Sequence, residues 1–150
     1  MKTLNKILAL SVIITAMFAF VACDDDEAGT RKPVFESITL SPKVTTPGEN
    51  VTLTINIKDK GNNAYIWRSE FAWVNKNDPK DKYQLSLPKE MSPITLDNPS
   101  YQFKAPNNPG TYTVSITPKI AYIAGDNLYD DGPTLTAELV VKSSTGGDEF

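Results

Sequence analysis

The side chains that could do chemistry in this sequence are few. Its 150 residues contain no histidine and a single cysteine, Cys23. Zinc sites built from Cys and His, and nucleophiles activated by an imidazole, are therefore excluded. Paired carboxylates and oxygen-only cation sites stay open to this chain, but no pair of acids can be assigned to general acid and base roles. The sequence predicts a protein that is not an enzyme.

Cys23 stands where an apolar run meets an acidic one. Lys2 and Lys6 precede sixteen uncharged residues, 7–22, and Ala22 comes directly before the cysteine. At ~1.5 Å per residue, a helix of this length spans roughly 24 Å, less than the ~30 Å core of a bilayer. No basic stop-transfer segment follows. The run is therefore predicted to be a cleaved secretory signal, residues 1–22, and not a membrane span.

This junction resembles the lipobox of bacterial lipoproteins, with Phe20 where that pattern usually has leucine. The acidic run 24–27 that follows resembles the surface-export signal of Bacteroidota-type lipoproteins. The resemblance implies lipidation at Cys23 and a lipid anchor in the outer membrane, facing the cell surface or, as the second alternative, the periplasm. Residues 23–32 are then the lipidated cysteine with an acidic tether, because a block of like charges does not fold.

The segment after the tether has the composition of one β-rich domain. Residues 33–142 hold 11 basic and 12 acidic side chains, so no net charge draws nucleic acid toward it. Apolar residues alternate with polar ones over residues 51–58, as in a strand that is buried on one face. Shorter strands are predicted from further alternating runs and from the turns between them, at 34–40, 69–75, 83–87, 94–96, 101–105, 112–116 and 135–141.

About seven to eight short strands without an amphipathic helix predict an all-β, immunoglobulin-like β-sandwich over residues 33–142. The stretch 103–114 is similar to the corner between the E and F strands of bacterial Ig-like and PKD-like domains. In that resemblance Tyr112 is the corner tyrosine, whose hydroxyl bonds back to the preceding turn. Residues 143–150 are polar and glycine-rich and are expected to be a disordered tail.

Two tryptophans receive different roles. Trp73 matches the core tryptophan of the third strand, so it is expected to pack and to be silent in binding. Trp67 falls in the connection before that strand, where exposed aromatic rings could stack on sugars; alternatively, the strand starts early and places Trp67 on the face of Phe71 and Trp73. The candidate ligand-binding residues are Trp67, Tyr65, Tyr122 and Tyr129.

The connection 118–133 is longer than most loops. Ile120 and Tyr122 continue the alternation of the preceding strand, so part of it could instead prolong a hairpin. Its oxygen-bearing side chains suit calcium but match no EF-hand spacing, and a solvated turn is the alternative. The candidate calcium ligands are Asp126, Asn127, Asp130 and Asp131. No other cofactor is predicted.

These features predict a non-enzymatic, lipid-anchored interaction module or accessory subunit of the cell envelope. The alternative is a carbohydrate-binding surface lipoprotein that accompanies a polysaccharide uptake system. The expected partners are the membrane, through the lipid, and an envelope protein or a glycan, but no nucleic acid. A cluster of exposed aromatic rings would favour a glycan, and a flat apolar patch would favour a protein.

Overall fold

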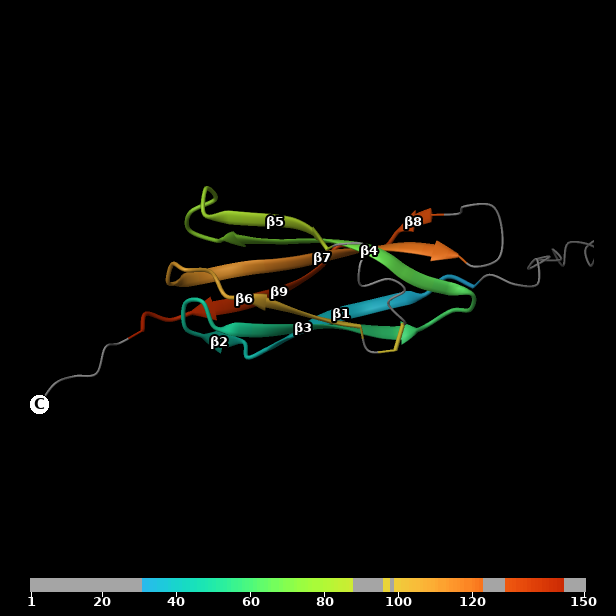
Figure 1. The fold of residues 1–150 in the computed structure, drawn as a ribbon, viewed down its shortest axis with the longest axis horizontal. Coiled ribbons are helices and arrows are strands. Elements are labelled where there is room, and N and C mark those ends of the chain that lie inside the picture. Colours follow the sequence, from blue (N-terminus) through green and yellow to red (C-terminus); the bar gives the residue numbers. More distant parts are fainter. Residues whose placement is uncertain (1–30, 88–95, 98, 123–128, 145–150) are drawn as a thin grey trace, which may run out of the picture.

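The computed structural model describes residues 31–87, 96–97, 99–122 and 129–144. The predicted signal segment, Cys23 and most of the tether lie outside these residues, as do the candidate ligands Asp126 and Asn127 and the tail from residue 145. The described part is all β, contains no helix, and forms two packed sheets, a β-sandwich (Figure 1).

The sheets differ in width. One has three strands in the order β1-β3-β6, and the other has five in the order β2-β9-β7-β4-β5, with β8 paired to β7 outside this path. The strands of the narrow sheet are β1 (Val34–Ser41), β3 (Asn50–Asp59) and β6 (Ser100–Lys104). Those of the wide sheet are β2 (Val44–Thr45), β9 (Leu135–Val141), β7 (Gly110–Tyr122), β4 (Ala64–Asn75), β5 (Lys82–Leu87) and β8 (Tyr129–Asp131).

The strongest alternating run forms a central strand. In β3, Val51, Leu53 and Ile55 are buried between the sheets, while the residues between them are more accessible. Leu139 of β9 and Tyr112 of β7 are also fully buried in this core. The predicted strands at 51–58, 83–87, 101–105 and 135–141 are confirmed to within two residues at each end. The predicted strand at 94–96 falls mostly outside the described residues, but Leu96 is buried in the core.

The first strand, predicted at 34–40, does not bury all of its apolar residues. Ile38 and Leu40 are buried, but Val34 is 48% exposed. The pairing of β1 with β3 shifts register between Val34 and Phe35 and again between Phe35 and Ser37. Because side chains alternate across a strand, such shifts move Val34 away from the core face.

The third predicted strand starts earlier than the run 69–75 indicated. β4 begins at Ala64, so Trp67 lies in a strand and not in a connection. The pairing with β7 shifts between Ile66 and Arg68, which leaves Trp67 as the extra residue of a β-bulge. Ile66, which precedes the bulge, is buried in the core, and Phe71, which follows it, is buried in the core as well. The early start of this strand confirms the alternative interpretation of Trp67, with the irregularity between Ile66 and Arg68 as the feature that the pattern did not predict.

The long connection 118–133 largely prolongs a hairpin. β7 continues to Tyr122, and β8 pairs back onto it with Lys119 opposite Asp131. The interpretation of the whole segment as a loop is therefore wrong for its two ends, while residues 123–128 lie outside the description.

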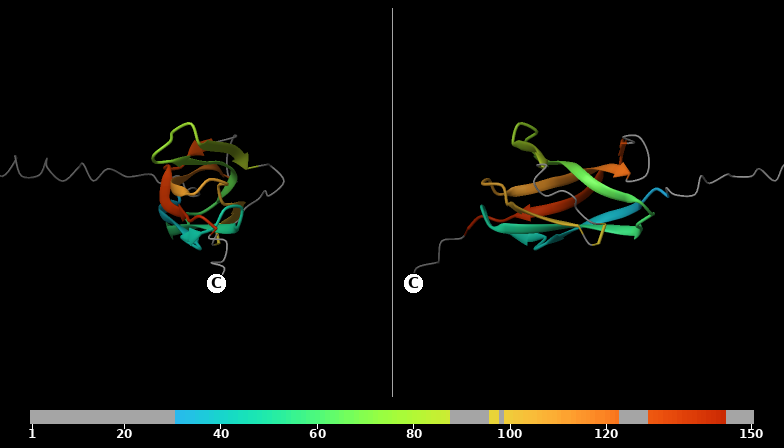
Figure 2. Two further views of the ribbon diagram at one scale, coloured as in Figure 1. Left: turned by 90° about the vertical axis from the view of Figure 1, so that its left-hand side faces the viewer. Right: turned by 45° about the vertical axis from the view of Figure 1, so that its right-hand side comes forward.

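The chain enters and leaves the sandwich at opposite ends (Figure 2). At the entry end, Arg31 bridges to Asn62 in the β3–β4 turn, and Lys32 forms a 2.6 Å ion pair with Asp130 of β8. β9 carries the chain out at the other end, beside the turn between β6 and β7. No helix in the described ranges is long and apolar enough to span a bilayer.

Candidate ligand-binding groove at the open edge of the sandwich

The unequal widths of the sheets leave one strand uncovered. The rings of Phe71 in β4 and Phe103 in β6 pack across the interior with centroids 4.8 Å apart, so β6 lies over β4. β6 ends the narrow sheet, whereas the wide sheet continues to β5. Side chains that β5 directs inward consequently face no strand in the described residues, and Tyr83 is 45% and Leu85 40% exposed.

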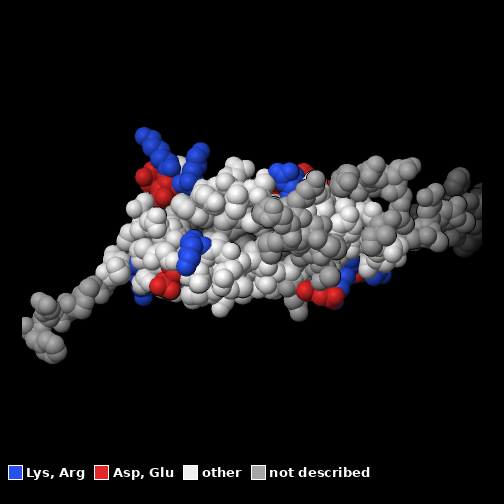
Figure 3. All heavy atoms as spheres, in the orientation of Figure 1, with Lys and Arg blue, Asp and Glu red and all other residues white. Residues whose placement is uncertain are grey.

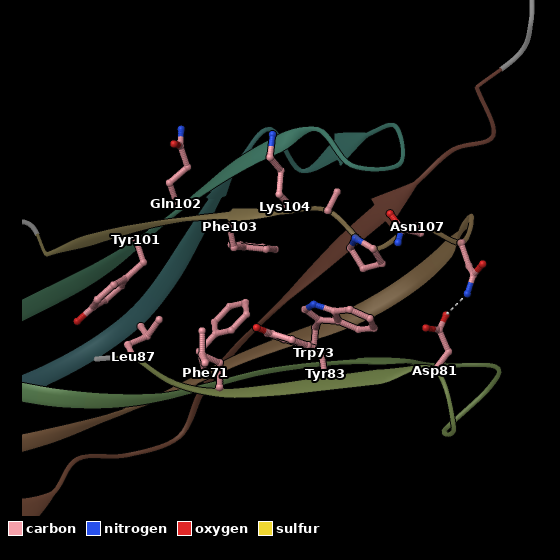
Figure 4. A pocket seen from close by; sticks show the side chains of 14 residues that line it. Phe71, Trp73, Asp81, Tyr83, Leu87, Tyr101, Gln102, Phe103, Lys104 and Asn107 are labelled. Atoms are coloured by element: carbon pink, nitrogen blue, oxygen red, sulfur yellow. Dashed lines mark hydrogen bonds between the residues drawn. The ribbon is translucent and has the colours of Figure 1, made fainter. Parts of the chain in front are cut away.

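A groove of about 480 Å³ follows this uncovered edge (Figure 4). That volume lies within the usual range for ligand pockets, roughly 300–1,000 Å³. Tyr101 and Phe103 of β6 point into it from one side, and Phe71 and Trp73 of β4 from the other. The remaining lining residues are Asp81, Tyr83, Leu85, Leu87, Gln102, Lys104, Ala105, Pro106, Asn107 and Asn108.

Aromatic rings form the base of the groove. Trp73 stacks on Tyr83 with centroids 5.8 Å apart and an interplanar angle of 20°. It also meets Tyr112 edge to face at 5.3 Å, which ties it to the core. Trp73 is partly buried. The expected packing role of Trp73 is confirmed, and its side chain also lines the groove.

One end of the groove is polar and held in place by a carboxylate. Asp81, in the β4–β5 connection, accepts hydrogen bonds from the Tyr112 hydroxyl at 2.6 Å, from Asn75 at 3.1 Å and from Asn108 at 3.3 Å. The Tyr112 hydroxyl also lies 2.8 Å from the carbonyl oxygen of Asn108, four residues earlier. This contact confirms the predicted bond from Tyr112 back to the preceding turn.

These contacts change the acidity of both partners. The hydrogen bond from Tyr112 lowers the pKa of Asp81, and those from Asn75 and Asn108 lower it further. Burial, followed by the bond to Asp81, raises the pKa of Tyr112 to about 12. The carboxylate thus stays ionised at neutral pH, and its Oδ2 accepts all three of these hydrogen bonds. This arrangement suits positioning of the groove wall and not proton transfer.

The aromatic residues singled out in the sequence do not meet in this groove. Tyr65 and Trp67 lie in the first part of β4, and Tyr122 is buried at the end of β7. Tyr129 begins β8. Tyr65, Tyr122 and Tyr129 lie close together in the sheet, since Ala121 pairs with both Tyr65 and Tyr129. They belong to the entry end and form no part of the groove lining.

The candidate calcium ligands that can be placed are engaged by lysines. Asp130 pairs with Lys32 at 2.6 Å, and Asp131 pairs with Lys119 at 2.7 Å. The contact with Asp130 raises the pKa of Lys32. Within the described ranges no group of three or more His, Cys, Asp or Glu side chains could hold a metal ion. The two placed aspartates therefore act as ion-pair partners in this structure.

The residues that sequence reasoning missed are Tyr83 and Leu85. Their alternation with polar neighbours identified the strand but not which strand would face them. The groove lining includes one acidic residue, Asp81, and one basic residue, Lys104. The face of the molecule drawn in Figure 3 carries charges of both signs, scattered among uncharged side chains.

Comparisons with known proteins give little further guidance. No protein-family model matches the chain, and no curated protein matches it. Among solved structures, it is similar to a β-sandwich protein from a study of computer-based redesign, at 15% identity and a TM-score of 0.47. That likeness covers 80% of this chain and 99% of the other. It carries no information about a ligand or partner.

Proposed function

We propose that this chain is a non-enzymatic, lipid-anchored interaction module of the cell envelope, with its binding site in the groove between β5 and β6. The observation that carries this proposal is the uncovered inner face of β5, with Tyr83 and Leu85 exposed above an aromatic base. Exposed apolar surface of this kind in a folded domain marks a site for a partner or ligand.

The proposal includes an immunoglobulin-like arrangement of the strands. The order β1-β3-β6 against β2-β9-β7-β4-β5 corresponds to A-B-E against A′-G-F-C-C′. The bond from the Tyr112 hydroxyl to the carbonyl of Asn108 matches a tyrosine corner. In this assignment no D strand is present among the described residues, and its place is beside β6, over the groove.

The anchor is proposed from the junction at Cys23. A thioether-linked lipid there would hold the entry end of the sandwich next to the outer membrane, on the cell surface. Replacing Cys23→Ala should leave uncleaved or soluble protein that incorporates no fatty-acid label. Labelling of the Cys23→Ala protein equal to that of the unchanged chain would reject the anchor.

A glycan is the second candidate ligand, and Tyr83 favours it. One face of the Tyr83 ring stacks on Trp73, and the residue is nevertheless 45% exposed. The free part of such a ring could stack on a sugar. Asn107 and Asn108 at the polar end offer amides for hydroxyl groups.

The proposed site is tested by placing a charge in the groove. Leu85→Lys should abolish recovery of a chemically cross-linked envelope partner, because a lysine head group there opposes burial of the groove. Val44→Lys is the matched control, since Val44 is 48% exposed and lies in β2 at the far edge of the wide sheet. Equal recovery from both variants would place the binding surface elsewhere.

A further inference from the structure

We propose that the groove receives an extended segment of a partner polypeptide, which pairs with β6 and becomes a fourth strand of the narrow sheet. This inference rests on the proposed function and names the kind of partner that the same site takes. It is carried by the directions of the backbone groups in β6, by the position of that strand over β4, and by the charge beside it.

Alternate backbone groups of β6 face away from the sheet. Ala105 donates its N–H to Glu49 at 2.8 Å, and the carbonyl of Pro99 accepts from Ile55 at 2.9 Å. Odd-numbered residues of this segment therefore direct their N–H and C=O groups toward β3. By the same alternation, Ser100, Gln102 and Lys104 present theirs at the open edge. In the described part of the chain no strand pairs with that edge.

A strand added beside β6 would lie over β5. Neighbouring strands are about 4.8 Å apart, so one further strand extends the narrow sheet to the width that the wide sheet already has on this side. Its inward side chains would enter the groove of about 480 Å³ and cover Tyr83 and Leu85. A strand added to β5 would lengthen the wide sheet and leave both residues uncovered. The geometry therefore favours addition of the partner strand to β6 over addition to β5.

Charge complementarity defines the other face of this partner segment. Lys104 points away from the groove (Figure 4) and is exposed at the open edge. It forms no ion pair with another residue of the described ranges. Opposite charges on cross-strand neighbours are stabilising, so the partner should alternate apolar residues with acidic ones.

The test is a substitution to proline, which removes one backbone N–H donor from the open edge of β6 and should leave the sandwich folded. The N–H of Gln102 faces the open edge, where proline is tolerated in strands. Gln102→Pro should therefore fold but block pairing. Gln84→Pro is the matched control, since Asn75 donates to the carbonyl of Asp81 and this alternation directs the N–H of Gln84 away from β4. Both variants are made in the full chain, solubilised in detergent, and checked for the same thermal midpoint.

The probe is a synthetic peptide of about ten residues in which valine alternates with glutamate and threonine, with a scrambled peptide of equal composition as its control. We expect the alternating peptide to slow hydrogen exchange at the amides of Gln102 and Lys104. Gln102→Pro should weaken its binding about tenfold and Gln84→Pro less than about twofold, because only the former removes an edge hydrogen bond.

Other results would overturn strand addition. Strand addition would be overturned if Gln102→Pro left the binding of the peptide unchanged. It would also be overturned if saturating peptide failed to slow hydrogen exchange at the amides of Gln102 and Lys104. Chemical shifts of the Tyr83 ring caused by a neutral oligosaccharide, with none caused by the peptide, would assign the groove to a glycan. A dimer of the unchanged chain that Gln102→Pro dissociates would assign the edge to a second copy. In each case the Leu85→Lys comparison still reports separately on whether the groove is the binding site.

Discussion

Asp81 and Tyr112 connect the core of the sandwich to the polar end of the groove. Tyr112 is fully buried, and its hydroxyl reaches Asp81 in one connection and Asn108 in another. A single phenol thus fixes two turns that border the groove. Because a hydrogen bond to an ionised acceptor is stronger than a neutral one, this pair should contribute more than an ordinary polar contact.

The first prediction concerns Tyr112→Phe, a substitution that removes this hydroxyl. Tyr112→Phe should lower the free energy of unfolding by about 1.5–3 kcal/mol, the range for hydrogen bonds to charged groups. Tyr101→Phe is the control, since the Tyr101 hydroxyl bonds within the described ranges to the neutral Ser69 hydroxyl at 3.1 Å, and it should cost about 1 kcal/mol. Urea unfolding of both variants measures the difference. Equal losses would show that the carboxylate adds nothing.

The second prediction concerns alkaline pH. The pKa of Tyr112 is raised to about 12 in the folded protein and is about 10 in an unfolded chain. Between these values the unfolded state releases the proton that the folded state keeps, so stability falls as pH rises. The contribution of Tyr112 is complete below pH ~10 and is lost toward pH ~12. Tyr112→Phe should flatten the fall of the urea midpoint over this window, and an unchanged slope would contradict the role of Tyr112.

At acid pH, the stability that Asp81 contributes changes with pH in the opposite direction. The hydrogen bond from Tyr112 holds the pKa of Asp81 below its ordinary value, so the folded state favours the ionised carboxylate. That contribution is present above the unfolded pKa of about 3.9 and disappears as the pH falls through the lower folded value.

The position of a strand in its sheet decides how deeply its leucine side chains are buried. Leu53 and Leu85 both point inward from strands of the sandwich. Leu53 lies in central β3 and is fully buried, whereas Leu85 lies in edge β5 and is 40% exposed. The same side chain therefore serves the core in one strand and lines the groove in the other.

This difference gives a matched pair of substitutions. Leu53→Ala should destabilise the domain by about 2–5 kcal/mol through lost burial and a cavity, and Leu85→Ala by less than about 1 kcal/mol. Denaturant midpoints with equal slopes measure both. A loss at Leu85 as large as that at Leu53 would show that the inner face of β5 is covered in solution.

Local patterns predicted most strands but not their partners. The alternation of Val51, Leu53 and Ile55 was sufficient for β3, because a half-buried strand has one simple period. The bulge at Trp67 and the shifts around Phe35 break that period, and no glycine or proline stands beside Trp67 to mark the change there. β2 is two residues long and pairs in parallel with distant β9, so no local run could indicate it.

The groove was harder to predict than the fold for a related reason. Tyr83 and Leu85 have the pattern of ordinary core residues, and their exposure follows from how far the opposite sheet extends. Sheet width is a property of long-range pairing. Sequence reasoning instead chose aromatic residues in or near long connections, and Trp67 and Tyr122 lie in strands, as the alternative interpretations of both predicted.

At the scale of the whole molecule, entry and exit lie at opposite ends. The entry end includes the contacts of Arg31 with Asn62 and of Lys32 with Asp130. The polar end of the groove, with Asp81 and Asn108, lies toward the exit end (Figure 1). With an anchor at Cys23, the entry end would be next to the membrane and this end of the groove would point away from it. A partner could then approach without contacting the lipid surface.

We propose that the groove between β5 and β6 holds the partner of this chain in the cell. A photo-crosslinking amino acid placed at Leu85, with the same group at Val44 as the control, tests this after irradiation of living cells. We expect a defined adduct with an envelope protein from position 85 alone, with the crosslinked residues of the partner in a segment that alternates apolar and acidic side chains. Adducts from Val44 and none from Leu85 would contradict the account.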